Sequence, residues 1–540
     1  MLNQKPDYAQ TYRDFEWQIP RHYNIGVDVC DKWADGSGRL ALIDEKSPDN
    51  ISRYTFDQLK EYSNQFARVL QKAGVGKGDR VGILLAQGVE TAIAHIAVYK
   101  LGAIAVPLFS LFGVDALQHR LSNSGARALV TNHEGMEKLA DIQESLPQLQ
   151  AVFNIDLAES SSTALDFWSS LRQEAPSFTA LNTLAEDPAV IIYTSGTTGK
   201  PKGALHAHRV LPGHLPGVEM SHDFLPVQGS VMWTPADWAW IGGLFDVLMP
   251  AWHHGIPVVA CRFAKFTAQA AFELMERHQV THTFLPPTAL KMMRHIENPR
   301  QQWNLNLRSI ASGGESLGLE LIEWGRHHLG ITINEFYGQT ECNMIVSSCA
   351  ALFEPDIGSI GKAVPGHKLA IINKLGNPVP NGQEGNIAVL APDPVMFLRY
   401  WKNPEATKEK FTGSWLLTGD MGVCDEAGFI RFVGRDDDVI TSAGYRIGPG
   451  PIEDCILGHP AVSMVAVVGL PDKERTEVVA AFVVLHDGVS ESEALKQEIQ
   501  AHVRHRVAAH EYPRQIYFVR ELPMTTTGKI IRKALRQQEL

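Results

Sequence analysis

The sequence predicts an α/β protein, with a large N-terminal domain of parallel-rich sheets covered by helices and a small α+β C-terminal domain. Three observations support this class. Short apolar runs alternate with helical patterns up to about residue 430. The 540 residues exceed what one hydrophobic core usually fills. The pattern changes near residue 434, so we expect domains at 1–434 and 435–540.

The alternation in the large domain is clearest in two stretches. Each stretch predicts a buried strand, then a helix, then a second strand: 80–87, 88–103 and 126–132, and then 255–261, 266–280 and 281–287. Repeated strand–helix alternation places successive strands parallel, with helices packed on the sheet faces.

The small domain has a denser pattern after a hairpin-like segment at 424–434. It predicts two strands, a helix and a third strand: 463–470, 477–485, 491–507 and 515–522. A polar, glycine-rich stretch with three adjacent aspartates, including Asp437, joins the domains. The aspartates form either a hinge near Asp437 or only a solvated turn.

Composition excludes several classes of partner. The formal net charge of −11 argues against a nucleic-acid or anionic-membrane partner. No apolar run approaches the roughly 18 residues of a membrane span, and the polar N-terminus has no signal-peptide pattern. The six cysteines lack a C-x-x-C pair. We therefore expect reduced thiols in a cytoplasmic protein.

The segment YTSGTTGKPKG, residues 193–203, follows a strand-like run. It is no Walker loop, which needs four residues between its first glycine and its Gly-Lys pair. Its hydroxyls, unhindered N–H groups and lysines favour polyphosphate binding, although a flexible surface loop alone would look similar. The candidate phosphate-binding residues are Thr194, Ser195, Gly196, Thr197, Thr198, Gly199, Lys200, Pro201 and Lys202.

Four further motifs accompany this loop. Glu341 in INEFYGQTEC could hold Mg²⁺, which binds through one or two carboxylates plus substrate phosphates. The turn ASGGESLG lets a ligand approach the backbone. WLLTGD ends a predicted strand on Asp420, which can accept hydrogen bonds from a ribose diol, with Arg435 near that site. Lys529 follows a glycine in PMTTTGKIIRKAL. Each motif alone also fits a turn, a capped helix or a solvated charge.

Together, these motifs resemble the adenylate-forming (AMP-binding) superfamily of acyl-CoA synthetases, peptide-synthetase adenylation domains and luciferases. The resemblance spans about residue 30 to the C-terminus. YGQTEC and TSAGYRIGP are most similar to medium-chain acyl-CoA synthetases and their acetyl- and propionyl-activating relatives. The resemblance implies that ATP and a carboxylate give an acyl-adenylate and pyrophosphate. Coenzyme A then takes the acyl group and AMP is released.

The resemblance also implies residue roles. Catalytic roles fall to Lys529, Glu341 and Thr194, with Glu341 as the Mg²⁺ ligand. ATP binding falls to the loop 194–202 and to Gly314, Glu315, Glu335, Phe336, Tyr337, Gly338, Gln339, Thr340, Asp420, Arg435 and Lys529. Lysine suits the charge that concentrates where a carboxylate meets a phosphate, because its ammonium is a compact point charge.

The small domain is expected to rotate about Asp437 between the two steps, which withdraws Lys529. The face that then meets coenzyme A carries Ala443, Gly444, Tyr445, Arg446 and Arg475.

The implied acyl pocket contains Trp240, Ile241, Gly242, Gly313 and Gly338. Acetate-specific relatives have tryptophan at the position of Gly338 and usually valine at that of Gly313. Two glycines therefore predict a deeper pocket, for short- to medium-chain, branched or aromatic acids. An acetyl- or propionyl-CoA synthetase and a stand-alone carrier-protein-loading enzyme remain alternatives, and monomer and homo-oligomer are both open.

Two features depart from simple expectations. Pro451 stands where the family usually has glutamate, and proline suits a first helical turn, so we expect the helix to begin normally. The segment HAH, residues 206–208, invites a metal interpretation. Histidines at i and i+2 point apart on a strand, and no third ligand is evident, so we reject it.

Overall fold

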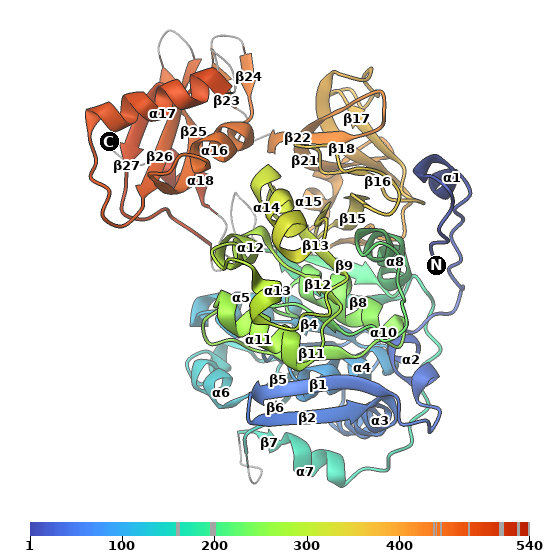
Figure 1. Cartoon of the computed structure of the whole chain (residues 1–540). Coiled ribbons are helices and arrows are strands. Elements are labelled where there is room, and N and C mark those ends of the chain that lie inside the picture. Colours follow the sequence, from blue (N-terminus) through green and yellow to red (C-terminus); the bar gives the residue numbers. More distant parts are fainter. Residues whose placement is uncertain are drawn as a thin grey trace. The chain divides into compact units, whose positions relative to one another are not determined.

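The computed structural model describes residues 1–157, 163–194, 201–435, 438, 440–442, 445–472, 476–506, 512–525 and 530–537 (Figure 1). Its contacts divide the chain into two compact units. Unit 1 holds most of residues 1–368 together with 391–409, and unit 2 holds 369–390 and 410–540. The domain boundary expected near residue 434 and the hinge at Asp437 stay predictions.

The first sheet of unit 1 has eight strands among the described residues, in the order β19-β9-β8-β4-β3-β5-β6-β7. Its pairs are parallel except β8–β9 and β9–β19. The strands are β3 (Arg80–Leu84), β4 (Ile104–Pro107), β5 (Ala128–Thr131), β6 (Ala151–Asn154), β7 (Leu165–Asp166), β8 (Pro188–Thr194), β9 (Lys202–Ala207) and β19 (Arg399–Tyr400).

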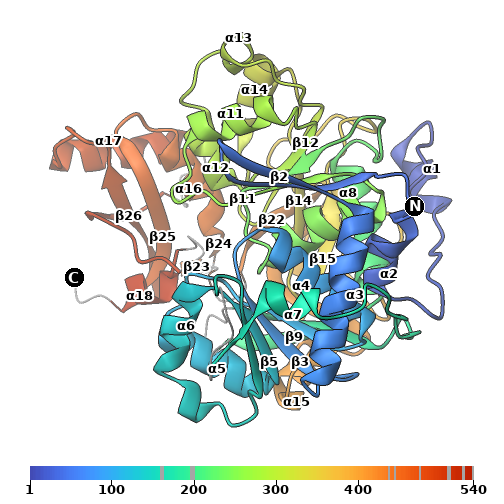
Figure 2. The ribbon, with the colours of Figure 1, turned by 90° about the horizontal axis from the view of Figure 1, so that it is seen from below.

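Helices cover both faces of this sheet (Figure 2). Side chains alternate along β3, so Ile83 packs with α3 (Phe56–Lys72) and α4 (Val89–Lys100). Leu84 packs on the opposite face with α5 (Val114–Ser124) and α6 (His133–Ala140). Every residue of α4 is buried, including Glu90, His95 and Lys100.

The second sheet of unit 1 has nine strands in the described chain, in the order β16-β15-β14-β13-β12-β10-β11-β1-β2. It is parallel from β1 to β14 and antiparallel at both edges. The strands are β1 (Leu40–Ser47), β2 (Asn50–Thr55), β10 (Met232–Trp233), β11 (Val258–Cys261), β12 (His282–Phe284), β13 (Ser309–Gly313), β14 (Asn334–Gln339), β15 (Cys342–Ser347) and β16 (Lys362–Ala363).

One face of this sheet packs against three helices through residues such as Val259: α11 (Ala268–Arg277), α12 (Pro287–Met293) and α14 (Leu319–Trp324). The other face shares a core with α4, α8 (Val210–Ser221) and α10 (Met249–His253). Both predicted strand–helix–strand stretches are confirmed. The remaining helices of unit 1 are α1 (Tyr8–Arg13), α2 (Ile25–Val29), η1 (Asp31–Trp33), η2 (Gln143–Ser145), α7 (Phe167–Arg172), α9 (Ile241–Gly243), η3 (Leu244–Leu248), α13 (Pro299–Gln302), η4 (Gly325–Leu329) and α15 (Pro404–Glu409).

Unit 2 contains two further sheets. The first has β17 (Leu369–Ile372), β18 (Glu384–Leu390), β20 (Phe411–Thr412), β21 (Trp415–Cys424) and β22 (Ile430–Arg435). The second has β23 (Ile440–Ser442), β24 (Tyr445–Ile447), β25 (Val462–Asp472), β26 (Thr476–Leu485) and β27 (Gln515–Phe518), with helices α16 (Pro449–Leu457), α17 (Glu493–Arg506) and α18 (Arg532–Arg536). The predicted strands and helix of the small domain are confirmed.

Two details of unit 2 bear on the sequence analysis. The strand of WLLTGD does not end at Asp420, which corrects the prediction. It runs to Cys424 because its backbone stays paired with β18 and β22, with a register shift after Met421. Pro451 lies in the first turn of α16, so that helix forms as expected.

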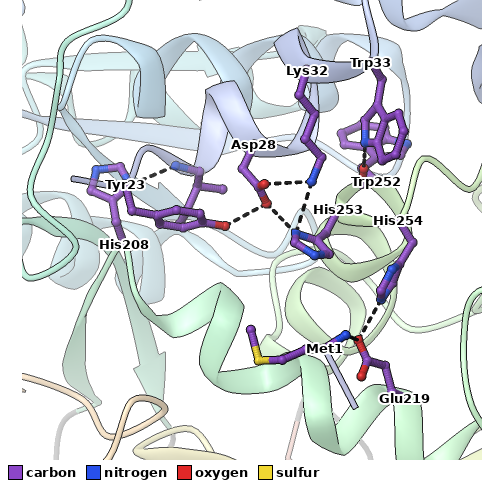
Figure 3. Close-up of polar contacts among 11 residues, drawn as sticks. Met1, Tyr23, Asp28, Lys32, Trp33, His208, Glu219, Trp252, His253 and His254 are labelled. Atoms are coloured by element: carbon purple, nitrogen blue, oxygen red, sulfur yellow. Dashed lines mark hydrogen bonds and ion pairs between the residues drawn. The ribbon is translucent and has the colours of Figure 1, made fainter. Parts of the chain in front are cut away.

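The N-terminal segment is tied to unit 1 by buried polar groups (Figure 3). The Met1 amino nitrogen lies 2.8 Å from Glu219 Oε1, which also lies 3.1 Å from His254 Nε2. Nearby, Asp28 accepts hydrogen bonds from Tyr23 and Lys32 and lies 2.6 Å from His253 Nδ1. Burial by itself would raise the pKa of Asp28, but the His253 and Lys32 contacts lower it to about 2.

Three absences hold within the described residues. No helix there is both long enough and apolar enough to cross a membrane. No group of three or more His, Cys, Asp or Glu side chains there could hold a metal ion, and the histidines of the HAH segment belong to no such group. No disulfide bond joins any of the six cysteines there.

Asp44 on β1 gives the fold a testable pH dependence. Its carboxyl is 3% exposed, and burial together with the Glu90 carboxylate raises its pKa from 3.8 to about 6. The protonated Asp44 carboxyl therefore contributes its full stabilisation of the folded state below about pH 4. This contribution is lost as the pH rises through about 6. Asp44→Asn keeps an acceptor for the Val89 N–H but cannot ionise. We expect it to gain about 1.4 kcal/mol of stability over the wild type on going from pH 5 to pH 8, because the rest of the effect already occurs below pH 5.

Thermal unfolding of both proteins at the two pH values measures this difference. Asp487→Asn, at an exposed position, is the matched control. A stability difference that stays constant between pH 5 and pH 8 would contradict the assignment of Asp44.

Candidate functional site

The base of the predicted phosphate loop is a pair of antiparallel strands in unit 1. Thr194, the last residue of β8, lies opposite Lys202, the first residue of β9. His119 Nε2 lies 2.9 Å from the Pro201 carbonyl oxygen at the same end. The loop residues between them, Ser195, Gly196, Thr197, Thr198, Gly199 and Lys200, lie outside the described residues.

Glu341 lies close to this base. It occupies the tight turn between β14 and β15, and its carboxylate accepts a hydrogen bond from the Tyr400 hydroxyl. Tyr400 pairs with Ala204 on β9, and its ring centre lies 5.3 Å from Lys202 Nζ. Tyr400 therefore connects the magnesium candidate with the strand that leaves the phosphate loop. Sequence reasoning missed Tyr400, which stands in no recognisable motif.

The surroundings of Glu341 fit a Mg²⁺ ligand. Its residue is 6% exposed, and its carbonyl oxygen accepts the Phe397 N–H at 2.8 Å, so its backbone is fixed. A single fixed carboxylate is enough for Mg²⁺ when substrate phosphates supply other oxygens. A buried carboxylate on a fixed backbone is therefore present where the sequence indicated a Mg²⁺ ligand.

Two glycines of the expected acyl pocket lie against two neighbouring aromatic rings. A Cβ on Gly242 would lie 3.0 Å from the Phe284 ring, and one on Gly313 would lie 2.6 Å from the Phe336 ring. The centres of these two rings are 5.2 Å apart. Larger residues at Gly242 or Gly313 would therefore press on the same aromatic pair.

Gly338 is confined more tightly. A Cβ there would lie 2.5 Å from Asn343 Oδ1 and 2.6 Å from the Met344 nitrogen, which are closer than real Cβ contacts. The glycine is thus required by the packing of β14 on β15 as well as by any pocket. An indole at this position could not be added without moving the start of β15.

Trp240 and Ile241 begin the segment that carries Gly242. The Trp240 ring packs against Phe109 and Phe112, with ring centres 5.5 and 5.8 Å away. Phe112 in turn lies under the Arg120 guanidinium, 3.9 Å from its ring centre. Trp240 therefore belongs to an aromatic cluster on the α5 side of unit 1, and the sequence did not indicate its ring partners.

The glycine-rich turn after β13 is open at its tip and anchored at its end. Gly314 has φ +94°, is exposed, and has no atom near the position of a Cβ. Glu315 beside it is half-buried. Glu335 Oε1 accepts the Leu317 N–H at 3.2 Å, so this carboxylate holds the turn. The open backbone at Gly314 can meet a flat ligand such as a nucleotide base.

The segment that follows Glu335 becomes less buried toward its end. Phe336 is 5% exposed and packs in the core, whereas Tyr337, Gln339 and Thr340 are half-buried. The half-buried side chains of this segment are the more accessible ones.

The ribose candidates lie in unit 2. Asp420 and Arg435 are cross-strand partners on β21 and β22, and Arg435 Nη1 lies 3.9 Å from Asp420 Oδ1. The Asp420 N–H donates to Thr418 Oγ1 at 3.1 Å, which fixes the backbone beside Gly419, where φ is +80°. Asp420 is 7% exposed. The structure confirms the neighbourhood of Asp420 and Arg435 that the sequence suggested.

Of the three adjacent aspartates in the joining stretch, the structure describes Asp438. Asp438 is 8% exposed and accepts from Arg536 Nη2 at 2.7 Å, and Arg532 Nη1 lies 3.7 Å from it. The Asp438 side chain is therefore buried and paired, and it does not lie in a solvated turn. Tyr445 and Arg446 lie on β24. The remaining expected residues of this region lie outside the described residues: Asp437, Ala443, Gly444, Arg475 and Lys529.

Comparison with known proteins gives two family matches. Residues 31–401 match the AMP-binding enzyme family, and residues 451–529 match the AMP-binding enzyme C-terminal domain. Both matches agree with the resemblance seen in the sequence.

Individual relatives cover almost the whole chain. An acetyl-coenzyme A synthetase of Bacillus subtilis (strain 168) is 33% identical over 550 residues, which cover 99% of this chain and 95% of the relative. The mitochondrial acyl-coenzyme A synthetase ACSM3 of Mus musculus is 31% identical, with coverages of 99% and 93%. The crystal structure of the anthranilate CoA ligase AuaEII with anthranoyl-AMP is 30% identical, with a TM-score of 0.87 and coverages of 96% and 97%.

Proposed function

Because the chain belongs to the AMP-binding enzyme family, we propose that it is an ATP-dependent acyl-CoA synthetase that works through an acyl-adenylate. The observation that carries the proposal is the link from Glu341 through Tyr400 to Lys202 at the base of the phosphate loop. A cation ligand and a phosphate-binding segment are thereby held together, as ATP chemistry requires. Named relatives that form acyl-CoA support the same reaction.

In the first step, the loop 194–202 holds the β- and γ-phosphates through its N–H groups, hydroxyls and lysines. Magnesium bound at Glu341 would neutralise phosphate charge. Asp420, with Arg435 beside it, accepts the ribose hydroxyls, and the Gly314 turn meets the adenine. Lys529 stabilises the charge where the carboxylate attacks the α-phosphate, and pyrophosphate leaves.

In the second step, the thiol of coenzyme A attacks the acyl-adenylate carbonyl, and AMP leaves. We propose that the small domain turns about Asp437 to withdraw Lys529 and to present Ala443, Gly444, Tyr445 and Arg446. Arg475 then binds a coenzyme A phosphate, since guanidinium groups bind phosphate through paired hydrogen bonds.

For the acid, we propose short- to medium-chain, branched or aromatic substrates. The Phe284 and Phe336 rings lie directly against Gly242 and Gly313, and aromatic walls suit flat or apolar acyl groups. The similarity to an anthranilate CoA ligase supports an aromatic acid as substrate. The similarity to an acetyl-coenzyme A synthetase is the reason to test short acids as well.

The test is AMP release from ATP with acids of two to ten carbons and with aromatic acids, each with and without coenzyme A. We expect steady AMP release that requires both an acid and coenzyme A. Equal AMP release without coenzyme A for every acid would contradict the synthetase.

Gly242→Ala should narrow the acyl pocket. Its Cβ would press on the Phe284 ring at 3.0 Å, a contact that a side chain can relieve at a modest cost. Overpacking costs about 1–3 kcal/mol, so we expect the specificity constant for hexanoate and benzoate to fall about 5- to 150-fold. Acetate should lose much less.

The measurement is the ratio of specificity constants for benzoate and acetate in wild type and variant. Gly76→Ala is the matched control, because a Cβ there meets no atom closer than 3.9 Å. An equal loss for all acids would place Gly242 outside the acyl pocket.

A further inference from the structure

A carboxyl group lies buried beside the proposed acyl pocket, in a segment that is otherwise apolar. Asp246 is the middle residue of η3, whose other residues are Leu244, Phe245, Val247 and Leu248. It is 3% exposed, and its Oδ1 accepts from Asn343 Nδ2 at 2.6 Å. The segment η3 is a single stretch of π-helix, a distortion that is frequent at functional sites.

The Asp246–Asn343 pair lies between two of the pocket glycines. A Cβ on Gly242 would lie 3.6 Å from Asp246 Oδ2, and one on Gly338 would lie 2.5 Å from Asn343 Oδ1. Gly242 also borders the Phe284 ring, which packs on Phe336. The pair and the two aromatic rings thus border the glycines of the proposed acyl pocket.

The carboxyl group has spare hydrogen-bonding capacity. Among the described residues, Asn343 is the side chain that hydrogen-bonds Asp246, and its Nδ2 donates to Oδ1 of Asp246. His214 Nε2 lies 4.0 Å from Oδ1, too far for a hydrogen bond, while His214 Nδ1 contacts the Val210 carbonyl at 2.7 Å. Oδ2, on the Gly242 side, is therefore left for a ligand.

The protonation state of Asp246 suits a neutral ligand group. Burial raises the pKa of this carboxyl well above its ordinary value, and the Asn343 hydrogen bond offsets only part of that effect. A neutral carboxyl both donates and accepts, so it can bind a hydroxyl or an uncharged amino group. Leaving a buried polar group without a partner is costly, which favours a substrate that supplies one.

We propose that Asp246 determines substrate specificity by hydrogen-bonding a hydroxyl or amino substituent on the acyl part of the acid. This inference rests on the proposed function, because it assigns Asp246 to the acyl pocket of that reaction. It narrows the substrate class from apolar acids to acids with one hydrogen-bonding substituent away from the reacting carboxylate. A site built to bind such a substituent discriminates strongly against the analogue that lacks it.

The test compares acids that differ by one substituent. The pairs are benzoate with its 2-, 3- and 4-hydroxy and 2-, 3- and 4-amino derivatives, and butyrate with 4-hydroxybutyrate. We expect the wild type to prefer at least one substituted acid over its parent by about tenfold or more in specificity constant. Asp246→Leu should abolish that preference and favour the parent acid. Asp246→Asn should keep part of it, because an amide also donates and accepts.

If Asp246 had only a structural role, its substitution would change the overall activity and not the preference among acids. It would lower activity toward all acids together and leave their ratio unchanged. Asp44→Asn, which alters a buried carboxyl on β1, is the control for such an effect and should leave the ratio unchanged.

The outcomes separate the inference from the proposed function. If no acid gives coenzyme A-dependent AMP, the proposed function is wrong. If acids react but the wild type shows no preference for any substituent, or Asp246→Leu keeps the wild-type ratio, only the inference is overturned. Should Asp246→Leu fail to fold, the wild-type panel and Asp246→Asn still decide.

Discussion

Lys529→Ala is expected to slow formation of the acyl-adenylate by about 10²–10³-fold or more, since that is the usual loss when one transition-state charge contact is removed. Lys529 is proposed to act only where the carboxylate meets the α-phosphate. Formation of the thioester from a supplied acyl-adenylate should therefore remain close to the wild-type rate. The two half-reactions are measured separately, by acid-dependent exchange of pyrophosphate into ATP and by acyl-CoA formation from synthetic acyl-adenylate.

Lys533→Ala is the matched control for Lys529→Ala. Lys533 is an exposed residue on α18, and its loss removes the same charge four positions further along the chain. It should leave both half-reactions nearly unchanged. Equal losses in both half-reactions of Lys529→Ala would mean that the lysine does not act in adenylation alone, and the account of domain alternation would be wrong.

Glu341→Gln is expected to weaken the use of Mg²⁺ and to slow adenylation by about 10²–10³-fold, the scale of losing one preorganised electrostatic contact. Glutamine has nearly the same shape as glutamate, and it still offers an oxygen to the Tyr400 hydroxyl. Only the charge that would bind the cation is removed. The rate of adenylation is measured as a function of Mg²⁺ concentration in wild type and variant.

Tyr400→Phe tests the positioning of that carboxylate. It removes the hydroxyl bonded to Glu341 but keeps the ring that lies near Lys202. We expect a loss of about 10- to 150-fold, the scale of one hydrogen bond to a charged group, with a raised Mg²⁺ requirement. If Glu341→Gln leaves the Mg²⁺ dependence of the wild type unchanged, Glu341 is not the cation ligand.

The sequence predicted the main elements because their signals are local. The pattern at residues 88–103 predicted a helix, and α4 forms there. The strand at Asp420 was misjudged because Gly419 looks like a terminator. In the structure a positive φ at Gly419 and a register shift after Met421 let the strand continue.

The site could be predicted only where a motif marks it. Glu341 stands in a motif, but Tyr400, which holds it, is 59 residues away in the chain. Asp246 and Asn343 are 97 residues apart and meet only through the packing of η3 on the sheet. Gly338 is a further example. The sequence shows that this position has no side chain, but not that Asn343 and Met344 leave no room for one.

The acyl-adenylate is the central claim, and an isotope measurement tests it most directly. The acid is supplied with both carboxylate oxygens labelled with ¹⁸O, together with ATP, Mg²⁺ and coenzyme A, and the products are analysed by mass spectrometry. Because the carboxylate oxygen attacks the α-phosphate and stays on it when the thiol displaces AMP, one ¹⁸O should appear in each AMP. Pyrophosphate should carry none. Label in pyrophosphate or inorganic phosphate, with unlabelled AMP, would contradict the account.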